Sequence, residues 1–208
     1  MKFLLFLTFC CTIVFGAIIP SLAPDLKPST AMADDPTGPP RVHKLLSRDS
    51  SAAYKEAKRA AKEEGVTLEN GEYYYFMSCN TARAGFTPSE PAVRYVLEQT
   101  GCTHVALVVG KITRTRWTKK FEATYLNVSD SPSGTAWKQL VNDYNPRSNQ
   151  KLIYGGQAVS SPSISALRIA GNDWLEQANV GGPNGGRQYS ESMNCLNYYY
   201  DLRDMVSA

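Results

Sequence analysis

The stretch that decides the fold is Thr103-His104-Val105-Ala106-Leu107-Val108-Val109-Gly110-Lys111-Ile112. It is a nearly unbroken apolar run, and we expect it to be the best-defined strand in the chain. Alternate residues of a strand share a face. Both faces are apolar here, so we expect a central strand of a sheet. His104 opens the run, which places it near an edge of the sheet where a site can form.

Other elements are expected on both sides of this strand. Phe121–Val128 predicts the second arm of a hairpin, and Glu72–Ser78 and Lys151–Tyr154 predict further strands. Start and stop signals predict helices over 50–64, 91–99, 135–144, 162–178 and 194–206, with a loop at 181–186. The expected fold class is α+β, a small antiparallel sheet packed with helices.

The N-terminal segment has the form of a secretory signal peptide. Lys2 is followed by an apolar run from Phe3 to Ile19. We assign residues 1–23 to the signal, with cleavage after Ala17 or Ala33 as alternatives, and a membrane anchor as the other interpretation. Residues 24–50 are rich in proline and polar residues, which predicts a disordered linker or pro-segment.

The remaining residues, 51–208, are enough for one domain with its own core. The formal net charge is +3, and the basic residues cluster only around the expected hairpin turn, where a solvated loop is the simplest explanation. We therefore expect no nucleic-acid partner. No stretch after the N-terminal run is long and apolar enough to cross a bilayer, so we expect no stable membrane insertion after signal cleavage. We also expect a monomer.

Three cysteines stay in the chain once the signal is removed: Cys79, Cys102 and Cys195. Cys79 and Cys102 each flank an expected strand with only a short helix between them, which favours a disulfide. Cys195 is then a free thiol, either buried and inert or useful. The alternative makes Cys79 the nucleophile and pairs Cys102 with Cys195. We expect no metal or cofactor, because the chain has only two histidines and its cysteines are isolated.

Cys195 opens an expected helix, and a helix N-terminus lowers the pKa of a thiol. His104 is the one histidine in the body of the domain, and a thiol beside a histidine is the basis of nucleophilic acyl transfer. Glu122 stands alone among apolar residues of its strand and would need a partner. We expect it near His104, or else in a cross-strand ion pair with Lys111 or Lys120.

These motifs carry a family resemblance. Thr103–Gly110 resembles the histidine strand of the NlpC-type papain-like superfamily, in the circularly permuted branch where histidine precedes cysteine. Lys120-Phe121-Glu122-Ala123 resembles the next strand of the bacterial YiiX-type proteins, and Asn194-Cys195 resembles the Asn-Cys motif of the lecithin:retinol acyltransferase group. The resemblance implies a permuted papain-like fold with Cys195 as nucleophile, His104 as base and Glu122 orienting the imidazole.

The resulting expectation is a secreted thiol hydrolase or acyltransferase that acts on an amide or ester in a peptide, lipid or cell-wall component. The alternative is a non-catalytic secreted effector or binding protein on the same fold. Asn127-Val128-Ser129 also predicts an N-glycan if the source is eukaryotic.

Overall fold

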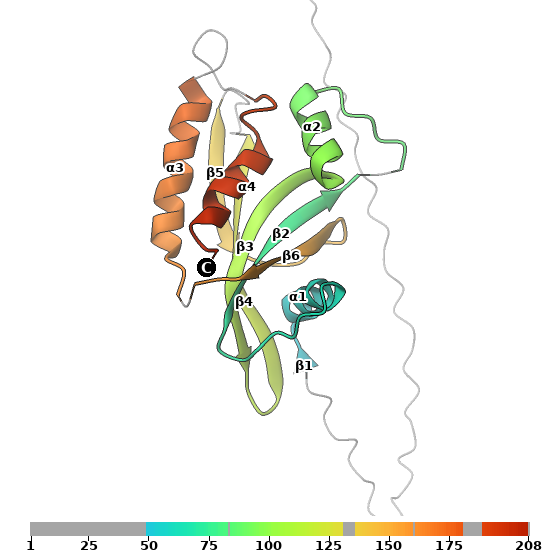
Figure 1. The fold of residues 1–208 in the computed structure, drawn as a ribbon, viewed down its shortest axis with the longest axis vertical. Coiled ribbons are helices and arrows are strands. Elements are labelled where there is room, and N and C mark those ends of the chain that lie inside the picture. The colour runs from blue at the N-terminus through green and yellow to red at the C-terminus, as the bar shows by residue number, and fades with distance from the viewer. Residues whose placement is uncertain (1–48, 83, 131–135, 160, 181–188, 208) are drawn as a thin grey trace, which may run out of the picture. The chain divides into compact units, whose positions relative to one another are not determined.

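A computed structural model describes residues 49–82, 84–130, 136–159, 161–180 and 189–207. Within these ranges the chain has the predicted α+β architecture, one six-stranded sheet with four helices packed on it (Figure 1). In chain order the elements are β1 Asp49–Ser50, α1 Ala52–Glu63, β2 Tyr73–Thr81, α2 Pro91–Thr100, β3 Cys102–Arg114, β4 Thr118–Asp130, β5 Trp137–Asp143, β6 Gln150–Gln157, α3 Ile164–Val180 and α4 Cys195–Asp204.

The sheet has the order β1-β4-β3-β2-β6, and β5 also pairs with β4. β2 to β6 are joined by antiparallel pairings, and only the two-residue β1 runs parallel to its neighbour. β1 and β5 therefore share one edge of β4, and β3 lies inside the sheet as predicted.

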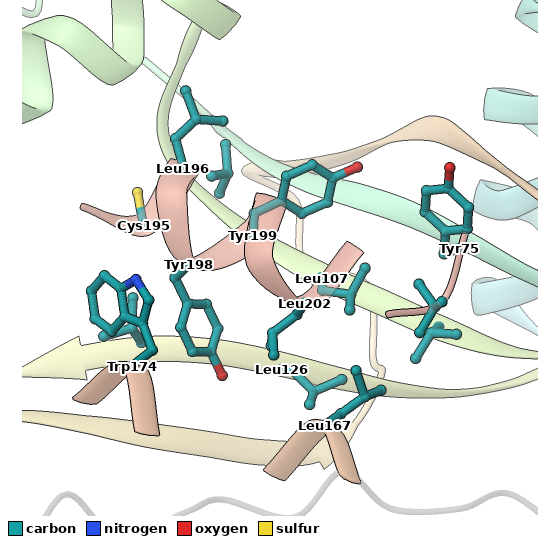
Figure 2. Packing of buried hydrophobic residues seen from close by; sticks show 14 of the residues in the cluster. Tyr75, Leu107, Leu126, Leu167, Trp174, Cys195, Leu196, Tyr198, Tyr199 and Leu202 are labelled. Carbon is teal, nitrogen blue, oxygen red and sulfur yellow. The ribbon is translucent and has the colours of Figure 1, made fainter. Parts of the chain in front are cut away.

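The alternation of β3 divides the core into two layers. Val105, Leu107 and Val109 pack in a cluster with residues of α2, α3 and α4, whereas Val108 and Ile112 pack in a second cluster with α1. Figure 2 shows the first cluster, where Tyr198 and Leu202 reach from α4 among Trp174, Leu126 and Leu167. Helices thus cover both faces of the sheet, and α4 lies over β3, the strand that carries His104.

Local signals set the helix ends close to their expected positions. Ser51 begins α1, where its Oγ accepts the N–H of Tyr54 at 3.1 Å. Pro91 occupies the first turn of α2. Gly101 ends α2 at φ 70°, a left-handed conformation that favours glycine.

α1 also covers part of the outer edge of β6. Glu56 accepts the backbone N–H of Leu152 at 3.2 Å, and Arg59 donates to the carbonyl of Leu152 at 3.0 Å. Glu56 and Arg59 are themselves paired at 2.6 Å. The N–H and the carbonyl of Leu152 in the edge strand thus have hydrogen-bond partners, so this part of the edge is not open to pairing with another strand.

The helix predicted over 135–144 is wrong. Trp137–Asp143 is strand β5, paired with residues 124–130 of β4. β4 is thirteen residues long, and its second half would present an open edge without β5. This tertiary pairing overrides the helix-favouring Lys138-Gln139-Leu140.

Several other predictions fall outside the described ranges. They are the signal peptide over 1–23, the loop at 181–186 and most of the linker over 24–50. The last two residues of that linker, Asp49 and Ser50, form β1 in the sheet.

Cys79 and Cys102 form a disulfide with their Cα atoms 5.3 Å apart, which confirms the predicted bond. Cys195 is a free, buried thiol. The alternative pairing, with Cys79 as nucleophile, is therefore wrong. No helix in the described ranges is long and apolar enough to span a membrane.

Candidate active site

Cys195 is the first residue of α4, and the residue before it builds the helix start. The Asn194 side chain accepts the N–H groups of Leu196 at 2.9 Å and Asn197 at 3.3 Å. Asn197 accepts the N–H of Asn194 at 3.1 Å, which completes a reciprocal capping box. Asn194 is fully buried and also donates to two carbonyls. The position of the Cys195 thiol is thus fixed by a rigid helix end.

His104 on β3 forms a hydrogen bond with this thiol. Burial alone would raise the pKa of Cys195, but the hydrogen bond and charge of His104 outweigh it and lower that pKa overall. Burial likewise lowers the pKa of His104, yet contact with Cys195 outweighs it and raises that pKa. The two groups stabilise each other's charged form, which favours a thiolate–imidazolium pair.

Asn127 on β4 holds the other side of the imidazole. His104 Nε2 and Asn127 Oδ1 are 2.5 Å apart, and Asn127 is 8% exposed. A carbonyl oxygen can only accept, so Nε2 carries a proton and the Nδ1 nitrogen is left to exchange a proton with the thiol. Asn127 therefore fixes the tautomer and the orientation of His104.

Tyr189 completes the surroundings of the sulfur. Its hydroxyl donates to Cys195 Sγ at 3.4 Å, and its ring packs against Trp137 with centroids 4.7 Å apart. Burial and the neighbouring Cys195 hold the pKa of Tyr189 far above its ordinary value, so the hydroxyl stays protonated and able to donate. The backbone of Val105 also hydrogen-bonds the sulfur.

The prediction that Glu122 lies near His104 is wrong. Glu122 is exposed and lies directly opposite Lys111. Lys111 is seven residues along β3 from His104, roughly 23 Å at the rise of a strand. The register instead agrees with the alternative interpretation, in which Glu122 faces a lysine across the strands. Asn127 takes the orienting position that the sequence had assigned to Glu122.

The position of Asn127 also bears on the predicted glycan. Its amide group is buried against His104 and is not open to a bulky sugar in the folded chain. The glycan prediction at Asn127 is therefore incompatible with this fold.

A hollow of about 350 Å³ lies beside the site. His104, Asn127 and Tyr189 form part of its wall, together with Trp137 and with Glu90 at the start of α2. Cys195 has no exposed surface. His104 and Tyr189 both contact the sulfur and line the hollow, so these two side chains connect the hollow to the thiol.

The described ranges contain no group of three or more His, Cys, Asp or Glu side chains that could hold a metal ion. The site is composed instead of a thiol, an imidazole, an amide and a phenol. These groups are equipped for nucleophilic attack and proton transfer. Comparisons with protein-family models, with curated proteins and with solved structures find no match to this chain.

Proposed function

We propose that the protein is a thiol hydrolase or acyltransferase, with Cys195 as nucleophile, His104 as general base and acid, and Asn127 orienting the imidazole. The observation that carries the proposal is the contact between a helix-start thiol and a histidine that is itself held by a third polar group. This is the arrangement by which a thiol is activated for acyl transfer.

The chemistry runs through a thioester. The Cys195 thiolate attacks the carbonyl carbon of an amide or ester, a C–S bond forms, and the carbonyl oxygen takes up negative charge. The N–H groups of Leu196 and Asn197 already donate to Asn194, which leaves the Tyr189 hydroxyl and the Cys195 N–H that contacts it to stabilise that charge. The C–N or C–O bond then breaks while His104 protonates the leaving amine or alcohol. Next His104 takes a proton from water or an acyl acceptor, which attacks the thioester; the C–S bond breaks and Cys195 is restored.

The wider proposal is a secreted, metal-free and monomeric protein of the permuted papain-like branch, acting on a peptide, lipid or cell-wall component. The Cys79–Cys102 disulfide supports an oxidising compartment. The order of His104 before Cys195 in an α+β fold supports the permuted branch.

The test is the rate of iodoacetamide labelling of Cys195 against pH, with peptide mass spectrometry to locate the label. We expect labelling well below pH 8, slowed by His104→Ala. A control is Glu122→Gln, since Glu122 is exposed and lies opposite Lys111, away from the proposed site. A labelling profile of an ordinary thiol near pH 8.5, unchanged in His104→Ala, would reject catalysis.

One observation favours a second candidate, a non-catalytic binding protein on the same fold. Cys195 is 0% exposed, as expected of an inert core cysteine. A binding protein has no use for a thiolate at neutral pH, so the same labelling experiment separates the two functions.

A further inference from the structure

The tip of the β3–β4 hairpin combines cations with an exposed indole. Residues 111–120 contain five cations and no carboxylate. Trp117, in the turn, is 54% exposed, whereas Trp174 is buried in the core. This tip, residues 114–119, has no part in the candidate active site.

Side-chain and backbone hydrogen bonds hold the tip in one conformation. Thr115 Oγ1 accepts the N–H groups of Trp117 at 3.2 Å and Thr118 at 3.0 Å, and the N–H of Thr115 donates to the carbonyl of Thr118 at 2.9 Å. At the base of the tip, Arg114 donates to the carbonyl of Leu68. A preformed tip presents Trp117 without the cost of ordering a loop on binding.

The Arg116 guanidinium lies over the Trp117 ring, 4.8 Å from its centroid. Lys120 is exposed on the adjoining part of β4. Carboxylate residues near the tip are Asp49, paired in register with Thr118, and Glu69, next to the Leu68 carbonyl that Arg114 binds. Four cations, Arg114, Arg116, Lys119 and the adjoining Lys120, outnumber these two carboxylates, so the tip is positive; Lys111 lies farther along β3, opposite Glu122.

The geometry points to reversible docking of this tip on an anionic phospholipid surface. Trp117 enters the headgroup region, where the apolar ring and polar N–H of indole are both accommodated. Arg116 and Lys120 contact lipid phosphates, and each cation near such a surface adds to the attraction. A turn joining two strands is a narrow, convex shape, which suits a deformable planar surface better than a partner that needs a groove.

Docking through the tip is independent of the proposed acyl transfer. The tip and the candidate active site lie at opposite ends of the β3–β4 hairpin (Figure 1). Trp117 is separated from His104 by roughly 35 Å of extended strand. The hollow therefore stays open when the tip is bound.

The test uses the chain without residues 1–23, so that the apolar N-terminal run does not itself bind lipid. The described sheet and both core clusters lie within 49–207 and are retained. Co-sedimentation and tryptophan emission are measured with phosphatidylcholine vesicles, with and without phosphatidylglycerol. We expect binding and a blue shift only with phosphatidylglycerol, and at least about tenfold weaker binding for Trp117→Ala and for Arg116→Gln with Lys120→Gln.

The matched control replaces two exposed lysines of α1, Lys58→Gln with Lys62→Gln, which changes the net charge equally. We expect it to bind almost as the parent does. The proposal fails if phosphatidylglycerol vesicles do not bind, if Trp117→Ala binds unchanged, or if the α1 control weakens binding as much as the tip variant. It also fails if heparin or an oligonucleotide binds through the same cations without Trp117. None of these failures alters Cys195 labelling.

Discussion

Asn127→Ala and Glu122→Gln distinguish the site in the structure from the triad expected from the sequence. Asn127 Oδ1 lies 2.5 Å from His104 Nε2, and a hydrogen bond to a charged imidazolium contributes about 1.5–3 kcal/mol. Its loss lowers the pKa of His104 and so makes the reactive thiolate–imidazolium pair about 10- to 100-fold less populated, at about 1.36 kcal/mol per tenfold. We expect Asn127→Ala to slow labelling near pH 6 by about 10- to 100-fold.

Glu122→Gln is expected to leave the labelling profile unchanged. Glu122 lies opposite Lys111 and is exposed to solvent. A charge roughly 23 Å from His104 is well beyond the Debye length of about 8 Å at physiological salt. The two variants therefore give opposite outcomes if Asn127 is the orienting residue.

The assay is iodoacetamide labelling from pH 5 to 10, with circular dichroism to establish that each variant is folded. Asn127 is buried, so Asn127→Asp is made as a conservative variant, whose carboxylate accepts the same hydrogen bond and keeps the thiol pKa low. The reasoning is refuted if folded Asn127→Ala keeps the parent profile, or if Glu122→Gln shifts it.

Three further predictions concern other parts of the molecule. Replacing Cys79 and Cys102 together by serine removes a cross-link between residues 23 apart in the sequence. The free energy of unfolding, measured in urea, should fall by roughly 3 kcal/mol. A fall of less than about 1 kcal/mol would contradict this expectation. Glu56→Gln should lower the free energy of unfolding by about 0.5–1 kcal/mol at pH 7, discounted for partial exposure. The hydrogen bond from Arg59 holds the pKa of Glu56 below its usual value, so its contribution is full above about pH 4.5 and is lost as pH falls through the lower folded pKa; a difference from the parent that persists at pH 2 would oppose this. Tyr189→Phe removes a donor to Cys195 Sγ, a hydrogen bond that lowers the pKa of the thiol, and should therefore shift the labelling profile to higher pH; a shift to lower pH would exclude a stabilising role for the hydroxyl.

The central strand and its flanking helix were predictable because their signals are local. The apolar run of 103–112 can be buried on both faces only inside a sheet. Pro91 and Gly101 fix the ends of α2 through their own backbone preferences. The β5 strand was not predictable in this way, because its pairing with β4 is a long-range interaction that the residues of 137–143 do not encode by themselves.

The sequence analysis did not find Asn127 because it did not fix the register between β3 and β4. In an antiparallel pair, residues are matched by counting outward from the turn. The turn at Arg116-Trp117 places Lys111 opposite Glu122, so the partners of His104 lie near positions 127–129. Predicting a tight turn at Arg116-Trp117 would have given this register, and with it a position near His104 for Asn127. Tyr189 offered no such signal, because the sequence does not show which side chain packs on a buried sulfur.

The Cys79–Cys102 disulfide and the burial of Cys195 both affect how the free thiol is held and how exposed it is. Cys102 is two residues before His104, and Thr103 donates to the carbonyl of Asn80 at 3.1 Å, so the disulfide and this hydrogen bond both hold the start of β3 to β2. The loop that the bond closes contains α2, whose first residues line the hollow. A free thiolate in an oxidising compartment would exchange with accessible disulfides. Enclosing the sulfur behind Tyr189 hinders a bulky disulfide more than a small reagent such as iodoacetamide, so burial of Cys195 is compatible with a reactive thiol as well as with an inert one.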